Sequence, residues 1–192
     1  MKNIKNTKTF YIGSLIFYSL TLSAQVAIGK TSVNGNSTLL DFGGATATNS
    51  PTDVETTNFK GIILPALTAT PTFSATTPTT NNPQNGTFIF DKTSVKVRMF
   101  TNGSWVDMSD TGSLTNLTSN TSAESGNGVI IGSNISSATG VLVLESPNKA
   151  IILPHIKNPH TTVKSPYAGM MCYDTVSNSI AVYDGSNWNY WK

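Results

Sequence analysis

The chain has 192 residues, of which 38% are hydrophobic and only 11% are charged, and its formal net charge is +2. Because a nearly neutral chain without a basic run has little electrostatic attraction for a polyanion, these numbers argue against nucleic acid as a partner. The length suffices for one or two modest hydrophobic cores. The single cysteine, Cys172, lies in the apolar run 169–173, which favours a buried thiol over an intermolecular disulfide.

The first 24 residues have the plan of a secretory signal peptide. Three lysines precede an apolar stretch, residues 10–22, and the small residue Ala24 closes the segment. The alternative is a membrane anchor, but a spanning helix needs about 20 apolar residues. We therefore expect cleavage after Ala24 and no stable membrane insertion afterwards. The remaining chain has nine basic and ten acidic residues. The predicted location is secreted or at the cell surface, with the periplasm left open.

The rest of the chain is duplicated. Five blocks recur in the same order: 26–29 as 129–132, 38–42 as 142–145, 60–65 as 149–154, 86–91 as 169–174, and the Asp-to-Trp segment 91–105 as 174–188. The offset between copies falls along the chain, so the first copy has longer loops, at 43–58 and 67–85. We divide the chain into a signal peptide (1–24), a first β module (25–109), a polar linker (110–127) and a second β module (128–192).

The repeated blocks have the composition of strands. They are short, apolar, rich in β-branched or aromatic residues, and bounded by Gly, Pro, Asn or Asp. Asn102-Gly103 and Asp184-Gly185 are hairpin-turn pairs between the last two strands of each copy. The sequence predicts an all-β fold of two tandem copies of a small antiparallel β module, with about six strands per copy and long Thr/Pro-rich loops.

The run Ile62-Ile63-Leu64 does not alternate with polar residues, which predicts a strand buried on both faces. Pro65 ends the ladder because proline has no N–H to donate. A small all-β unit cannot easily cover such a strand by itself, since it buries too little of its surface. We therefore expect the protein to form a homo-oligomer.

These blocks together resemble a known kind of module. The order Val-x-Ile-Gly, Lys-Gly-Ile-Ile-Leu-Pro, Gly-x-x-x-Tyr/Phe-Asp and a final Trp is typical of a duplicated β module of secreted bacterial proteins. It is similar to the stalk modules of phage tail-fibre-like proteins, over residues 26–108 and 129–191. The resemblance implies a homotrimer with interwoven strands.

The sequence predicts no catalytic, cofactor or metal site, and hence no enzyme. His155 and His160 could form a metal pair, but no ligand-like carboxylate or thiol lies near them, which favours two exposed loop imidazoles. Paired carboxylates for glycoside hydrolysis are the enzymatic alternative. The candidate carboxylates are Asp91, Asp107, Asp110, Asp174 and Asp184. Asp91 and Asp174 recur at equivalent positions after a strand, which favours a role in capping turns.

The aromatic residues near the ends of the two copies are the candidates for ligand contact. Trp105 and Trp188 recur in register, which favours packing, whereas Tyr190 and Trp191 have no aromatic counterpart in the first copy. The leading hypothesis is a non-enzymatic structural or adhesive protein, fibre- or stalk-like, with a trimer as the favoured assembly. The alternative is a carbohydrate-binding module that uses these aromatics to contact a surface glycan.

Overall fold

The computed structural model describes residues 25–33, 36–42, 60–73, 82–117, 126, 128–138 and 140–192. The predicted signal peptide and most of the two long Thr/Pro-rich loops lie outside these ranges. The boundaries proposed for the signal peptide, modules and linker therefore stay a prediction.

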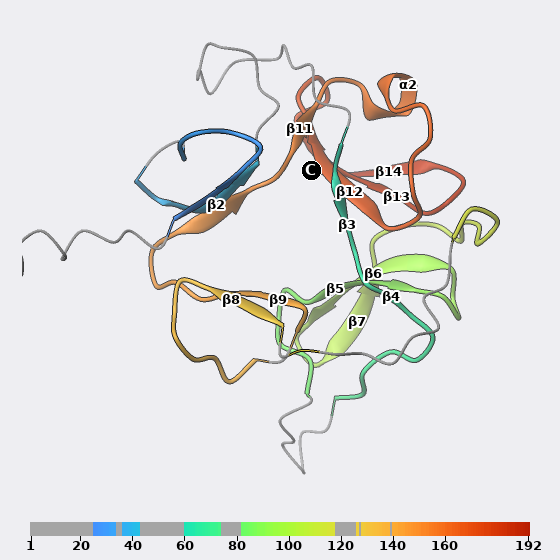
Figure 1. The fold of residues 1–192 in the computed structure, drawn as a ribbon. Coiled ribbons are helices and arrows are strands. Elements are labelled where there is room, and N and C mark those ends of the chain that lie inside the picture. Colours follow the sequence, from blue (N-terminus) through green and yellow to red (C-terminus); the bar gives the residue numbers. More distant parts are fainter. Residues whose placement is uncertain are drawn as a thin grey trace, which may run out of the picture.

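Nearly all regular elements are strands, which confirms the predicted all-β class (Figure 1). The strands of the first copy are β1 (Val26–Ile28), β2 (Thr38–Phe42), β3 (Ile62–Ile63), β4 (Ala66–Leu67), β5 (Phe88–Asp91), β6 (Lys96–Thr101) and β7 (Ser104–Asp107). Those of the second copy are β8 (Val129–Ile131), β9 (Leu142–Leu144), β10 (Ala150–Ile152), β11 (His155–Ile156), β12 (Met170–Asp174), β13 (Ser179–Tyr183) and β14 (Trp188–Trp191). The four-residue helix α2 (Pro159–Thr162) follows β11.

Each copy ends in an antiparallel meander, as predicted. In the first copy β5, β6 and β7 pair in order, and in the second copy β12, β13 and β14 do the same. The equivalent pairs Phe100↔Trp105 and Tyr183↔Trp188 lie at the same position of the last hairpin. A short strand, β4 or β11, joins the edge of each meander in parallel orientation.

The two meanders share one hydrophobic core. Its buried members come from both copies. Phe90 and Val97 of the first copy lie in the same cluster as Met171 and Val182 of the second. Leu64, Met108 and Ala168 complete the cluster. The two copies therefore pack against each other, because each meander covers the apolar face of the other.

Two strand pairs also cross between the copies. In the first, β10 of the second copy pairs in parallel with β2 of the first copy. In the second, β3 of the first copy pairs antiparallel with β12 of the second copy. The sequence analysis predicted antiparallel modules in tandem. It predicted neither the parallel strand pairs nor the exchange of strands between the copies. Pro65 and Pro154 mark the points where the chain leaves an exchanged strand and returns to its own meander.

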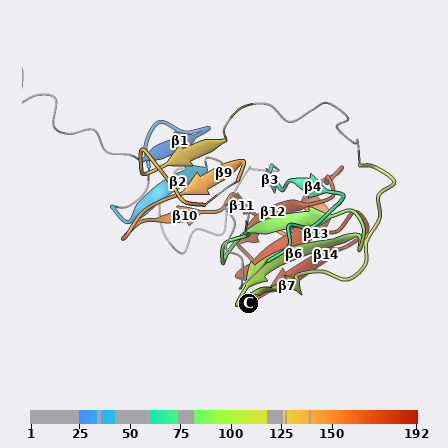
Figure 2. The same ribbon diagram turned by 90° about the horizontal axis from the view of Figure 1, so that it is seen from below.

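The remaining parallel strands lie together on one side of the molecule. Figure 2 shows β1, β2, β9 and β10 there, apart from the two meanders. They form a three-stranded sheet, β1-β2-β10, and a two-stranded sheet, β8-β9.

The prediction of two-sided burial for the segment 62–64 is wrong for the single chain. Leu64 is buried, but the side chain of Ile63 is 47% exposed. The reason is that β3 has a partner along one edge only among the described strands, namely β12.

The turn between β5 and β6 contains a strained residue. Val95 has φ +57°, whereas the equivalent residue in the turn between β12 and β13 is Asn178, with φ +54°. Left-handed backbone is unfavourable for a β-branched residue and tolerated by asparagine. The Asn178 side chain also accepts a hydrogen bond from the Tyr173 hydroxyl, at 3.2 Å.

We expect Val95→Asn to raise the free energy of unfolding by about 1 kcal/mol, because relief of left-handed strain exceeds the loss of Val95's partial packing against the core. The matched variant Asn178→Val should lower it by about 1–2 kcal/mol. Urea unfolding followed by tryptophan fluorescence measures both. A loss of stability in Val95→Asn would contradict this account of the turn.

Candidate functional site

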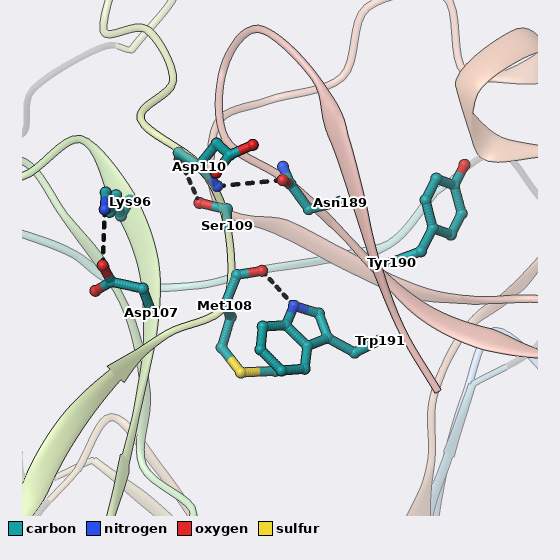
Figure 3. Close-up of a pocket in the computed structure, with 8 residues that line it drawn as sticks. All are labelled: Lys96, Asp107, Met108, Ser109, Asp110, Asn189, Tyr190 and Trp191. Carbon is teal, nitrogen blue, oxygen red and sulfur yellow. Dashed lines mark hydrogen bonds and ion pairs between the residues drawn. The ribbon is translucent and has the colours of Figure 1, made fainter.

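The described residues form a surface pocket where the last strands of the two copies meet (Figure 3). Its volume is about 350 Å³. One wall is the end of β7 with the segment after it, and the other is β14. The lining residues are Lys96, Asp107, Met108, Ser109, Asp110, Asn189, Tyr190 and Trp191.

The two C-terminal aromatic residues diverge in the pocket because successive residues of a strand point to opposite faces. The indole of Trp191 extends toward Met108, and its Nε1 donates a hydrogen bond to the Met108 carbonyl. The ring of Tyr190 points away from it, and its hydroxyl lies 3.0 Å from Nδ1 of His160 in α2. Partial burial, together with the nearby Asp174 carboxylate, raises the pKa of Tyr190 to about 12. Trp191 is therefore the aromatic side chain that faces the first copy.

The first copy supplies the charged side of the pocket. Lys96 Nζ lies 2.7 Å from Asp107 Oδ2, and Arg98 Nε lies 3.0 Å from Asp107 Oδ1 without the alignment of a hydrogen bond. The backbone N–H of Asp110 donates to Asn189 Oδ1 at 3.2 Å, which ties the two walls together. An indole beside carboxylate, ammonium and amide groups could stack on a sugar ring and bond its hydroxyls.

The structure does not bring all four predicted aromatics together. Tyr190 and Trp191 line the pocket, whereas Trp105 and Trp188 do not. Trp105 packs edge-on against Phe100 at 5.3 Å and donates its Nε1 hydrogen to the Pro71 carbonyl. Trp188 packs on Tyr183 at 5.4 Å and covers a second small core. Sequence reasoning did not propose Lys96 or Asn189. No local sequence signal marks them, because the two strand ends meet only through the packing of the two copies.

The recurrent aspartates cap turns, as predicted. Asp91 accepts hydrogen bonds from the Thr93 N–H and the Ser94 hydroxyl, both at 2.8 Å. Asp174 accepts equivalent bonds from the Val176 N–H at 3.1 Å and the Ser177 hydroxyl at 2.8 Å. Burial by itself raises the pKa of either carboxyl, but these hydrogen bonds outweigh burial and hold both pKa values below the usual range.

Another buried candidate, Asp184, accepts hydrogen bonds from the N–H groups of Ser186 and Asn187 at 2.8 and 2.7 Å. All three of Asp91, Asp174 and Asp184 are at most 3% exposed. Their oxygens accept hydrogen bonds from turn residues and from Arg98, Asn158 and Asn189, so these three carboxylates form no open pair for glycoside hydrolysis.

The two histidines lie in short regular elements, so their placement in a loop was wrong. His155 is in β11 beside the ring of Tyr173, with centroids 5.2 Å apart, and His160 is in α2. In the described part of the chain, no three His, Cys, Asp or Glu side chains gather to hold a metal ion.

The prediction of a buried Cys172 is confirmed, since this side chain is fully buried in the second small core. Burial, with a contribution from the Asp174 carboxylate, raises the pKa of its thiol to about 12. A protonated, inaccessible thiol is a poor nucleophile and a poor partner for disulfide exchange.

Comparison with known proteins gives a family match. Residues 130–192 match the family model described as "Phage tail like trimerisation region". This segment contains almost the whole second copy, so the predicted resemblance to phage tail-fibre-like modules is confirmed there. No curated protein and no solved structure matches the chain. The described residues also include no helix long and apolar enough to cross a membrane.

The lowered pKa of Asp174 makes stability depend on acid pH. A carboxyl with a folded pKa below its unfolded value, about 3.9, stabilises the protein above that value and loses the contribution as pH falls through the folded pKa. We expect Asp174→Asn to lower the free energy of unfolding by about 1–3 kcal/mol at pH 7.

The difference in free energy of unfolding between this variant and the unmodified protein should shrink below about pH 4. In that range the Asp174 carboxyl becomes protonated and, like the amide, carries no charge. Urea unfolding at pH 7 and at lower pH values measures this difference in free energy. The control is Asp110→Asn, because Asp110 is an exposed residue. A difference that stays constant across the whole pH range would refute the assignment.

Proposed function

We propose that this chain is a trimeric, fibre- or stalk-like structural protein that works by assembly and contact and not by catalysis. The observation that carries the proposal is the match of residues 130–192 to a phage tail like trimerisation region. The two-stranded sheet β8-β9 supports it, because this sheet has no further strand in the described part of the chain, whereas parallel strands are normally covered on both faces.

The exposed apolar side chains of this region fit an assembly surface. Val129, Val141 and Leu142 are 56%, 59% and 44% exposed, and they lie on or beside β8 and β9. Grouped apolar side chains on a soluble protein commonly mark an interaction site. Export through the predicted signal peptide 1–24 would place such a trimer outside the cytoplasm, in a secreted or surface-attached form.

A second candidate function is recognition of a surface glycan by the pocket. The observation that favours it is the partly exposed indole of Trp191, 41% exposed, beside Asp107 and Asn189. Sugars are commonly bound by an aromatic face with polar groups at its rim. An adhesive role would follow if such a pocket were repeated three times in one assembly, because multivalency raises avidity without new contacts.

The trimer predicts a mass of three chains for purified residues 25–192. Light scattering coupled to size-exclusion chromatography, over a wide range of concentrations, measures it. A mass of one chain at every concentration would overturn the proposal.

The glycan candidate predicts that a glycan array gives binding that Trp191→Ala removes. Trp105→Phe is the matched control, because Trp105 lies outside the pocket, and this variant should keep the binding. Equal loss in both variants would indicate a general effect on folding, and no binding by the unmodified protein would end this candidate.

A further inference from the structure

The two copies contain the same strands in the same order, but the pairs between copies are formed only once. The third strand of the second copy, β10, lies on the second strand of the first, β2. The third strand of the first copy, β3, lies on the fifth strand of the second, β12. The reciprocal pairs, β3 with β9 and β10 with β5, are not found among the described strands. The described strands of one chain therefore form one set of the pairs between copies, and the equivalent second set is missing.

One edge of β9 has no partner among the strands that the structure describes, and it is a regular strand edge. On its other side, Val129 N–H donates to the Val141 carbonyl and Glu145 N–H donates to the Ile131 carbonyl, both at 2.9 Å. Because backbone groups of alternate residues point to opposite edges, the N–H and C=O groups of Leu142 and Leu144 point away from β8. This edge can accept another parallel strand.

Burial shows what the additional strand provides. In β2, which β10 covers, Leu39 and Leu40 are 2% and 0% exposed. In the equivalent strand β9, Leu142 is 44% exposed. Within β3, which would supply the missing strand, Ile63 is 47% exposed. The exposed apolar side chains therefore lie on both halves of the missing pair.

We propose that neighbouring chains complete each other by the same exchange, with β3 of one chain pairing with β9 of the next and β10 of the next pairing with β5 of the first. This inference rests on the proposed function, since it specifies how the trimer is held. Both pairs are formed across one interface between the first copy of one chain and the second copy of its neighbour. Such a heterologous contact repeats from chain to chain and closes as a ring when the rotation permits.

The pairs seen within the chain predict the register between chains. Ile151 lies opposite Leu40. Leu40 also pairs with Val26, and Leu142 pairs with the equivalent residue Val129, so Ile62 and Leu142 should lie opposite each other. Ile62 lies opposite Met171 within the chain, so Ile151 of the neighbour should face Phe88. Neighbouring strands are about 4.8 Å apart, which is within the Cα separation that a disulfide spans.

The test is disulfide trapping in the full mature chain. The double variant Ile62→Cys/Leu142→Cys should give covalently linked dimers and trimers on a non-reducing denaturing gel after mild oxidation. The control Thr38→Cys/Ala150→Cys uses a pair already present within one chain and should migrate as a single chain. Ile62→Cys alone should stay uncrosslinked, because the native thiol of Cys172 is buried.

Light scattering on the same samples separates two failures. A three-chain mass without links between chains, or with links from Ile62→Cys/Leu40→Cys instead, would overturn the exchange and leave the trimer standing. A one-chain mass for the unmodified protein would overturn the trimer itself.

A second pair of variants covers the case in which the cysteine variants do not fold. Leu142→Asp places a charge at the proposed interface and should reduce the mass to one chain, since an unpaired charge is costly to bury. Val176→Asp, in an equally exposed turn residue at 46%, should leave the three-chain mass unchanged. Equal masses for both variants would contradict the assignment of this surface.

Discussion

The need of each strand edge for a backbone partner is the constraint on which the rest of this structure depends. The third strand of each copy does not stay beside its own second strand but pairs with the other copy, as β10 does with β2 and β3 with β12. This exchange brings the meanders together, so that Phe90 and Val182 share one core. It also leaves β9 with one edge that pairs with no other strand among the described residues. In the proposed assembly, folding and association use the same kind of contact.

The pocket is a consequence of the same arrangement. Because the two meanders pack on each other, the equivalent positions Met108 and Trp191 meet at the ends of their last strands. The turn aspartates Asp91 and Asp174 hold the hairpins that lead there, through hydrogen bonds that lower their pKa values. A trimer would present three such pockets, which connects the structural role with the candidate role in glycan contact.

Local features of the sequence were predictable, and long-range ones were not. The strands, the turn pair Asn102-Gly103 and the capping role of Asp174 followed from composition and turn chemistry, which depend on neighbouring residues. The exchange of β3 and β10 did not follow, because an apolar run such as 62–64 predicts that it needs cover but not which strand covers it. Lys96 and Asn189 entered the pocket only through the packing of the two copies.

The central claim is that open strand edges of one chain are paired by its neighbours, and hydrogen exchange at the amides of β9 tests it most directly. In the assembled protein, the amides of Leu142 and Leu144 should exchange as slowly as that of Val143, which faces β8, and dilution into single chains should speed up only the first two. Fast exchange at Leu142 and Leu144 in a sample with the mass of three chains would contradict the account.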